Sequence, residues 1–177
     1  TAREVGHISG AGIGLAYRSE VLLAIGRITE AQSNCTEAIS IAQSVSNRED
    51  FVKATIASLE INLTMGKPEK TKTTYLENKD AISSYKGEGL DDRALVYYAH
   101  SLALTNEISL ANSILNDTRN TAPSWPHVQI RNQIARGKAR LALGQPERAI
   151  ANFQYALTEA TTCQFRYWQM VAHHHLY

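Results

Sequence analysis

The sequence contains few of the residues that mark several common classes of protein. Its only cysteines, Cys35 and Cys163, lack the Cys-x-x-Cys spacing of a redox or zinc site. We therefore interpret them as buried thiols in a reducing compartment rather than as a disulfide or a metal site. Only four prolines and 20% charged residues stand beside 44% hydrophobic residues. This composition excludes a disordered or fibrous chain and is typical of an ordered, helix-rich protein.

The chain also lacks a strong net charge and a long apolar run. The formal net charge of +1 creates no global field that would attract nucleic acid or an anionic membrane, so we expect no direct binding to either. No apolar run approaches the ~20 residues of a membrane-spanning helix, and residues 1–7 carry no signal-peptide pattern. We expect a cytoplasmic protein. Because the sequence begins without methionine and stops at Tyr177 within a helix-like run, we interpret it as a fragment of a longer protein.

Motifs of catalysis and cofactor binding are missing as well. The chain contains no Gly-x-Ser-x-Gly, Ser-x-x-Lys or His-Glu-x-x-His motif, so we predict no catalytic residue, no cofactor and no enzymatic activity. Residues 10–14, Gly-Ala-Gly-Ile-Gly, have no strand before them and no lysine after them, so we expect a turn between helices. His173, His174 and His175 would point about 100° apart on a helix and could not converge on one metal ion. We predict no metal site there and expect a surface or capping role.

What the sequence does contain is an internal repeat. Gly26 is followed by three alanines, and Gly144 is followed by three alanines at the same three intervals. These alanines are Ala31, Ala38 and Ala42 in the first copy and Ala149, Ala156 and Ala160 in the last. Fainter copies have Gly66 and Asn106 at the marker position, so the four markers follow one another at nearly equal intervals along the chain.

Each copy predicts two antiparallel helices joined by a tight turn. Glycine at the marker allows the positive φ that commonly ends a helix, and Pro68 and Pro146 stand where a new helix can begin. The alanines let the paired helices approach closely. Because such hairpins bury their apolar faces only by stacking, we predict an all-α fold, a right-handed α-α superhelix of about four repeats in one domain spanning residues 1–177. The expected repeats are 11–47, 50–86, 90–122 and 127–162, with the first helix at 15–25 and an extra helix at 163–177.

We expect the extra helix to present an exposed apolar side made of Phe165, Trp168, Met170 and Val171. Its second helix, the partner that would complete a fifth repeat, is not in the sequence. An apolar side without such a partner favours association. We therefore predict a crystal contact or a homodimer contact through this helix.

The spacing of glycine and alanine resembles the signature of the tetratricopeptide (TPR) repeat, and the aromatic residues Tyr75 and Phe153, nine residues after their markers, fit it too. The usual tryptophan of the first helix and the closing proline are absent. The period of about 38 to 40 residues exceeds the family norm of about 34. This longer version resembles the repeat domain of MalT-like, LuxR-type, ATP-dependent bacterial transcription regulators, best over residues 135–149. The resemblance implies that the domain senses an inducer and relays the signal to an ATPase module.

Charged residues recur at two positions of the first helix of each repeat. Thirteen residues before the markers stand Ile13, Lys53, Arg93 and Arg131, and six residues before them stand Glu20, Glu60, His100 and Lys138. Positions seven residues apart are separated by about two helical turns and share a face, and the resemblance to TPR folds implies that this face lines the concave surface. The candidate ligand-binding residues are therefore Lys53, Glu60, Arg93, His100, Arg131 and Lys138. They could hold an acidic peptide, a carboxylate or a phosphorylated metabolite, or they could form an ordinary solvated face with surface ion pairs.

These patterns favour a non-catalytic domain for protein–protein interaction and effector sensing in a bacterial transcription regulator. Its partner would be a protein, a peptide or a small effector in the concave groove. One alternative is a general scaffold or adaptor that binds a peptide or a helix in that groove without a small ligand. A fragment of an enzyme built on a helical solenoid is a third hypothesis.

Overall fold

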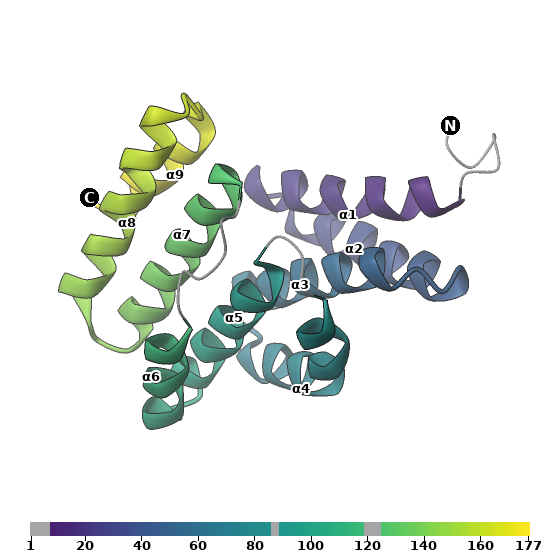
Figure 1. The fold of residues 1–177 in the computed structure, drawn as a ribbon, viewed down its shortest axis with the longest axis horizontal. Helices are drawn as coiled ribbons and strands as arrows, with labels where there is room; N and C mark the ends of the chain where they lie inside the picture. Colours follow the sequence, from purple (N-terminus) through teal and green to yellow (C-terminus); the bar gives the residue numbers. More distant parts are fainter. Residues whose placement is uncertain (1–7, 86–88, 119–124) are drawn as a thin grey trace. The chain divides into compact units, whose positions relative to one another are not determined.

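The computed structural model describes residues 8–85, 89–118 and 125–177. In this part of the chain all regular structure is helical, without any strand (Figure 1). The helices are α1 (Ile8–Ala24), α2 (Ile28–Ser44), α3 (Arg48–Thr64), α4 (Pro68–Ser84), α5 (Leu90–Leu104), α6 (Ile108–Asp117), α7 (Pro126–Ala142), α8 (Pro146–Thr162) and α9 (Arg166–His174). The predicted all-α fold is confirmed. Residues 1–7 and the predicted repeat ends at 86 and 122 lie outside the described residues.

The chain divides into two compact units, residues 1–85 and 86–177. In the first unit α1 contacts α2 and α3, α2 contacts α3, and α3 contacts α4. In the second unit α5 contacts α6 and α7, while α7 and α8 contact each other and both contact α9. Alternate helices such as α1 and α3, or α5 and α7, therefore pack together in addition to consecutive ones. This is the contact pattern of stacked helix pairs.

One type of turn recurs between helices in the described part of the chain. In each such turn one residue has positive φ and donates its N–H to the carbonyl three residues earlier, and the next residue donates to the carbonyl five positions before itself. This Schellman arrangement satisfies the last carbonyls of the preceding helix. The residues with positive φ in these turns are Gly26, Ser46, Gly66, Asn106, Gly144 and Gln164. Turns inside the predicted repeats and turns between them thus have the same geometry.

The small residues after each marker are buried between the helices. Ala31, Ala149 and Ala156 have exposed fractions of 0%, as does Thr71 in the second copy. One position on a first helix must also be small. A Cβ atom added at Gly137 of α7 would lie 2.4 Å from the Cε1 atom of Phe153 in α8, so the α7 backbone lies directly against that ring.

The prediction of a turn at residues 10–14 was wrong, because these residues lie inside α1, which starts at Ile8 rather than near residue 15. Glycine is tolerated within a helix where a neighbouring element comes close. A Cβ at Gly12 would lie 3.0 Å from the Cγ2 atom of Ile41 in α2, so the absence of a side chain at Gly12 permits close packing of α1 on α2. The other glycines of this segment face outward, and a Cβ at Gly14 would contact nothing within 4 Å.

Several helices start where the sequence contains a proline or an N-capping residue. Pro68, Pro126 and Pro146 each occupy the first turn of a helix, which confirms the prediction for Pro68 and Pro146. At the start of α3, the side-chain oxygen of Asn47 accepts a hydrogen bond from the backbone N–H of Asp50 at 3.1 Å, while its amide nitrogen donates to the Asp50 carboxylate at 2.9 Å. The Asp50 carboxylate therefore helps to fix the N-cap.

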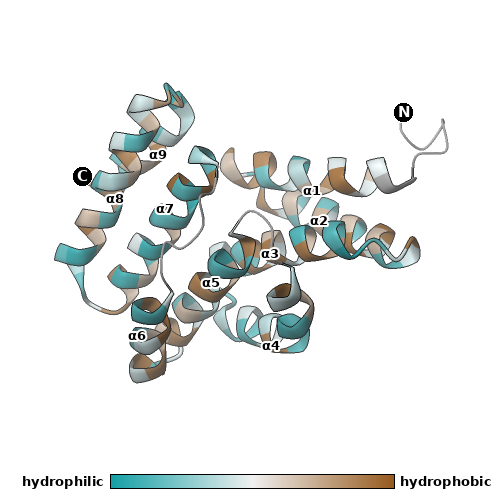
Figure 2. Cartoon of the chain, in the orientation of Figure 1, coloured by the Kyte–Doolittle hydropathy of each residue, from teal (hydrophilic) through white to brown (hydrophobic). Residues whose placement is uncertain are grey.

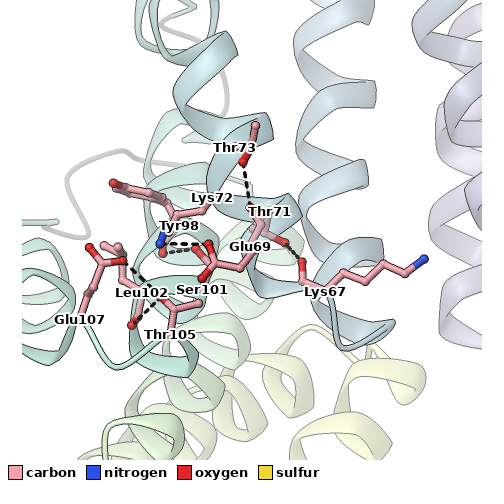
Figure 3. A network of polar contacts seen from close by, with 10 residues as sticks. All are labelled: Lys67, Glu69, Thr71, Lys72, Thr73, Tyr98, Ser101, Leu102, Thr105 and Glu107. Carbon is pink, nitrogen blue, oxygen red and sulfur yellow. Dashed lines mark hydrogen bonds and ion pairs between the residues drawn. The ribbon is translucent and has the colours of Figure 1, made fainter.

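Many polar side chains on the helices are satisfied locally. Figure 2 shows hydrophilic and hydrophobic residues alternating along the helices. In α4, the Thr73 hydroxyl donates to the carbonyl of Glu69 at 3.1 Å, and the Glu69 carboxylate pairs with Lys72 at 3.1 Å (Figure 3). In α5, the Ser101 hydroxyl donates to the carbonyl of Tyr98 at 2.6 Å. Such hydroxyl-to-carbonyl bonds allow serine and threonine to lie within helices without an unsatisfied donor.

The C-terminal helix α9 packs more deeply than the sequence suggested. Trp168 and Val171 pack against the core of α7 and α8, so the prediction that they would be exposed was wrong; Met170 and Phe165 do remain exposed. The reason is that α9 packs directly on apolar residues of α7 and α8, which buries part of its own apolar side. Cys35 is buried, as predicted, and donates from Sγ to the carbonyl of Ala54 at 3.1 Å. Cys163 is half-buried, and both thiols are free.

Candidate functional site

Two of the predicted site residues, Lys53 and Glu60, lie on α3 in the first unit. Both are half-buried and, as predicted, stand about two turns apart on the same helix. The Lys53 ammonium forms an ion pair of 2.8 Å with the carboxylate of Glu49 one turn earlier. That hydrogen bond lowers the pKa of Glu49. Lys53 is therefore already engaged by a carboxylate of its own helix.

The other four predicted residues lie on two helices that contact each other in the second unit. Arg93 and His100 are on α5, and Arg131 and Lys138 are on α7. Arg93 is buried, whereas His100, Arg131 and Lys138 are half-buried. The guanidinium carbon of Arg131 lies 5.6 Å from the ring centroid of Trp168 on α9, a cation–π contact. The second unit therefore places these basic groups on neighbouring first helices, as the spacing of the repeat predicted.

His175 belongs with this group, although the sequence interpretation assigned the three histidines to the surface or to a cap. Its ring stacks on Phe153 at a centroid distance of 4.9 Å, and it is half-buried at the end of α9. Burial, followed by the positive charges of Lys138 and His174, lowers the pKa of His175 to about 4. His173 and His174 are exposed. A signal was present in the sequence, because the interval from Lys138 to His175 is nearly equal to the interval from His100 to Lys138.

His100 is a half-buried titratable group on α5. Burial, followed by the positive charge of Lys138, lowers the pKa of His100 to about 4. Both His100 and His175 are therefore neutral near pH 7, and each neutral imidazole offers one N–H donor and one acceptor nitrogen.

Arg136 is a buried charge that sequence reasoning did not single out. Its guanidinium donates to the carbonyls of Leu115 at 3.3 Å and Thr118 at 2.7 Å, at the C-terminal end of α6. Burial lowers the pKa of Arg136, while the nearby charge of Asp92 acts in the opposite direction. A cation at a helix C-terminus interacts favourably with the helix dipole. Arg136 therefore fixes the end of α6 against α7 and has a structural role.

Among the described residues, no group of three or more His, Cys, Asp and Glu side chains is placed to hold a metal ion. No helix in the same residues is both long enough and apolar enough to cross a membrane. No protein-family model, curated protein or solved structure compared with the chain matches it.

Proposed function

We propose that this chain is a non-catalytic helical repeat domain that binds a partner through the first helices of the repeats in its second unit, α5 and α7. The observation that carries the proposal is the placement of polar residues in the second unit. The second helix α8 directs Ala149, Ala156 and Ala160 into the core, whereas α7 carries Arg131 and Lys138 at half-buried positions. Most of α7 is itself buried, and Arg131 and Lys138 are among the charged residues that it leaves partly accessible to a partner.

We further propose that the repeats are of the TPR type and that the domain is the sensing part of a MalT-like bacterial transcription regulator, acting in the cytoplasm. The burial of the alanine positions and of Phe153 supports the TPR assignment. A half-buried binding face with basic and aromatic groups from α5, α7 and α9 favours a small effector or a peptide as partner. A general scaffold that binds a peptide or helix remains the second candidate, because an open helical face serves either ligand.

Thermal unfolding in the presence of candidate ligands tests this proposal. A ligand at about 100 times its Kd stabilises the folded state by about 2.7 kcal/mol, which raises Tm by about 5–10 °C for a chain of this length. A metabolite library and a peptide library would be screened in parallel, and each hit repeated with Arg131→Gln. Hits among metabolites that weaken in the variant support the sensor. Hits only among peptides support the scaffold, and no hit in either library contradicts a binding function for this face.

A further inference from the structure

The first-helix face of the second unit has an unusual charge composition. Helix α7 contains four basic side chains and no aspartate or glutamate, and residues 163–177 contain no acidic residue either. The acidic residues of α5, Asp91 and Asp92, are confined to its first turn. Arg136 is directed at the end of α6, where Asp92 acts on it, and Arg140 donates to Gln145. The charge of Lys138, by contrast, is not offset by a carboxylate on α7 or in residues 163–177, which favours anions at this face.

The side chains of this face are arranged in two rows across neighbouring helices. Arg131 and Lys138 are seven residues apart on α7, and Trp168 and His175 have the same separation at α9. Arg131 contacts Trp168 where α7 meets α9, so Lys138 and His175, each seven residues further along, occupy matching positions. Each row therefore lies about 10 Å from the other along the helix axes. The first row contains Arg131 and Trp168; the second row contains His100, Lys138 and His175.

One member of the second row, His175, is fixed by contact with a residue of the hydrophobic core. His175 stacks on Phe153, which is fully buried in the core of α7, α8 and α9. His100, Lys138 and His175 occupy equivalent repeat positions at α5, α7 and the end of α9, and α7 contacts both of the other helices. In agreement with this placement, the positive charge of Lys138 contributes to lowering the pKa of both imidazoles. All three side chains are half-buried. Within the described residues, no carboxylate forms an ion pair with Lys138.

We propose that His100, Lys138 and His175 form a binding site for an oxyanion, a carboxylate or phosphate group carried by the partner of this domain. The ammonium of Lys138 supplies the charge, and the two imidazoles supply N–H donors. The partly buried position strengthens these interactions relative to a fully solvated lysine. This inference rests on the proposed binding function, and it names the chemical class of the ligand.

Nuclear magnetic resonance of the imidazole groups tests the site directly. The Cε1–H signals of the six histidines would be followed while the whole chain is titrated with sodium phosphate or with sodium glutarate. Each titration is compared with sodium chloride at equal ionic strength. We expect saturable shifts of the His100 and His175 signals with at least one of the two oxyanions. Tighter binding of phosphate would identify a phosphorylated ligand, and tighter binding of glutarate would identify a carboxylate ligand.

Two variants establish whether Lys138 and His175 hold the anion. Lys138→Met should weaken binding by about ten-fold or more, because it removes the charged donor. Lys79→Met, an exposed position on α4 with the same change in net charge, is the matched control and should bind as the original chain does. His175→Phe retains an aromatic ring over Phe153 but removes the N–H donor, so it should keep the fold and weaken binding several-fold.

The inference is overturned if His100 and His175 respond to chloride and to the oxyanions alike, or if Lys138→Met and Lys79→Met bind equally. The proposed function has a separate test. If the screened metabolites or peptides stabilise Lys138→Met as strongly as the original chain, the domain binds a partner but not through an oxyanion at this site.

Discussion

Replacing Gly137 with alanine should destabilise the second unit even though alanine is the better helix former. A Cβ at this position would lie 2.4 Å from Cε1 and 2.5 Å from Cζ of Phe153. The ring cannot simply withdraw, because Phe153 is fully buried among α7, α8 and α9 and is stacked against His175. Overpacking of this kind costs about 1–3 kcal/mol, while the gain in helix propensity is about 0.5–1 kcal/mol. We therefore expect a net loss centred on about 1 kcal/mol and no larger than about 2.5 kcal/mol.

Urea unfolding followed by circular dichroism would measure this loss. Gly14→Ala is the control, since an added Cβ there meets nothing within 4 Å and the residue is also within a helix. It should stabilise the chain by about 0.5–1 kcal/mol. The opposite signs of the two glycine-to-alanine changes would separate packing from helix propensity.

A double-mutant cycle identifies Phe153 as the cause. Phe153→Leu removes ring atoms that the new methyl group would meet, so the cost of Gly137→Ala should shrink in the Phe153→Leu background. A Gly137→Ala variant as stable as the original chain would refute the close approach of α7 to Phe153. An unchanged cost in the double mutant would show that another contact is responsible.

Three further changes test other features of the fold. Ser46→Gly should raise the free energy of unfolding by about 1 kcal/mol, because Ser46 has a φ of 52°, whereas Ser40→Gly, an exposed position inside α2, should lower it by a similar amount in the same urea assay. Arg136→Met should cost about 2–4 kcal/mol by leaving two carbonyls at the end of α6 without their donor, and hydrogen exchange of the α6 amides should accelerate. Because the pKa of His100 is lowered to about 4, the unfolded chain binds more protons between about pH 6.5 and 4, so stability should fall as the pH decreases through that window, by up to about 3 kcal/mol from His100. His175, whose pKa is also lowered to about 4, adds to the same window. His100→Gln should therefore reduce this part of the pH dependence without abolishing it, and an unchanged profile would show that His100 does not contribute.

The sequence predicted the helical hairpins because their signals are local. Glycine at positive φ, proline in the first turn and alanine at the helix contacts each act within a short stretch of chain. Ser46 and Gln164 adopt the same turn as Gly26 although neither is a glycine. Their residue types therefore do not predict a positive φ. Their turns are imposed by the packing of the helices on either side, and tertiary contacts override local preference there.

Gly12 of α1 and His175, the C-cap of α9, show why the remaining features could not be predicted. Gly12 looked like part of a turn because glycine is rare within helices, and only the distance to Ile41 explains its place in α1. His175 was dismissed as one of three adjacent histidines that cannot converge on one metal ion. That geometric argument holds, but it does not address a single imidazole, that of His175, which stacks on Phe153 of another helix.

The shared turn geometry has a consequence for how the chain folds. Gly26, Ser46 and Gly66 are evenly spaced along the chain, and Gly144 and Gln164 have the same separation, so the recurring element is one helix with one turn rather than a hairpin. Pairs such as α1 with α2 or α2 with α3 then close over equally short stretches of chain. Contacts of low sequence separation favour rapid folding, and nucleation can begin at any adjacent pair and spread in either direction. A substitution that destabilises one turn should therefore change the order in which the helix pairs of a unit form. Only a stronger destabilisation should prevent the unit from folding.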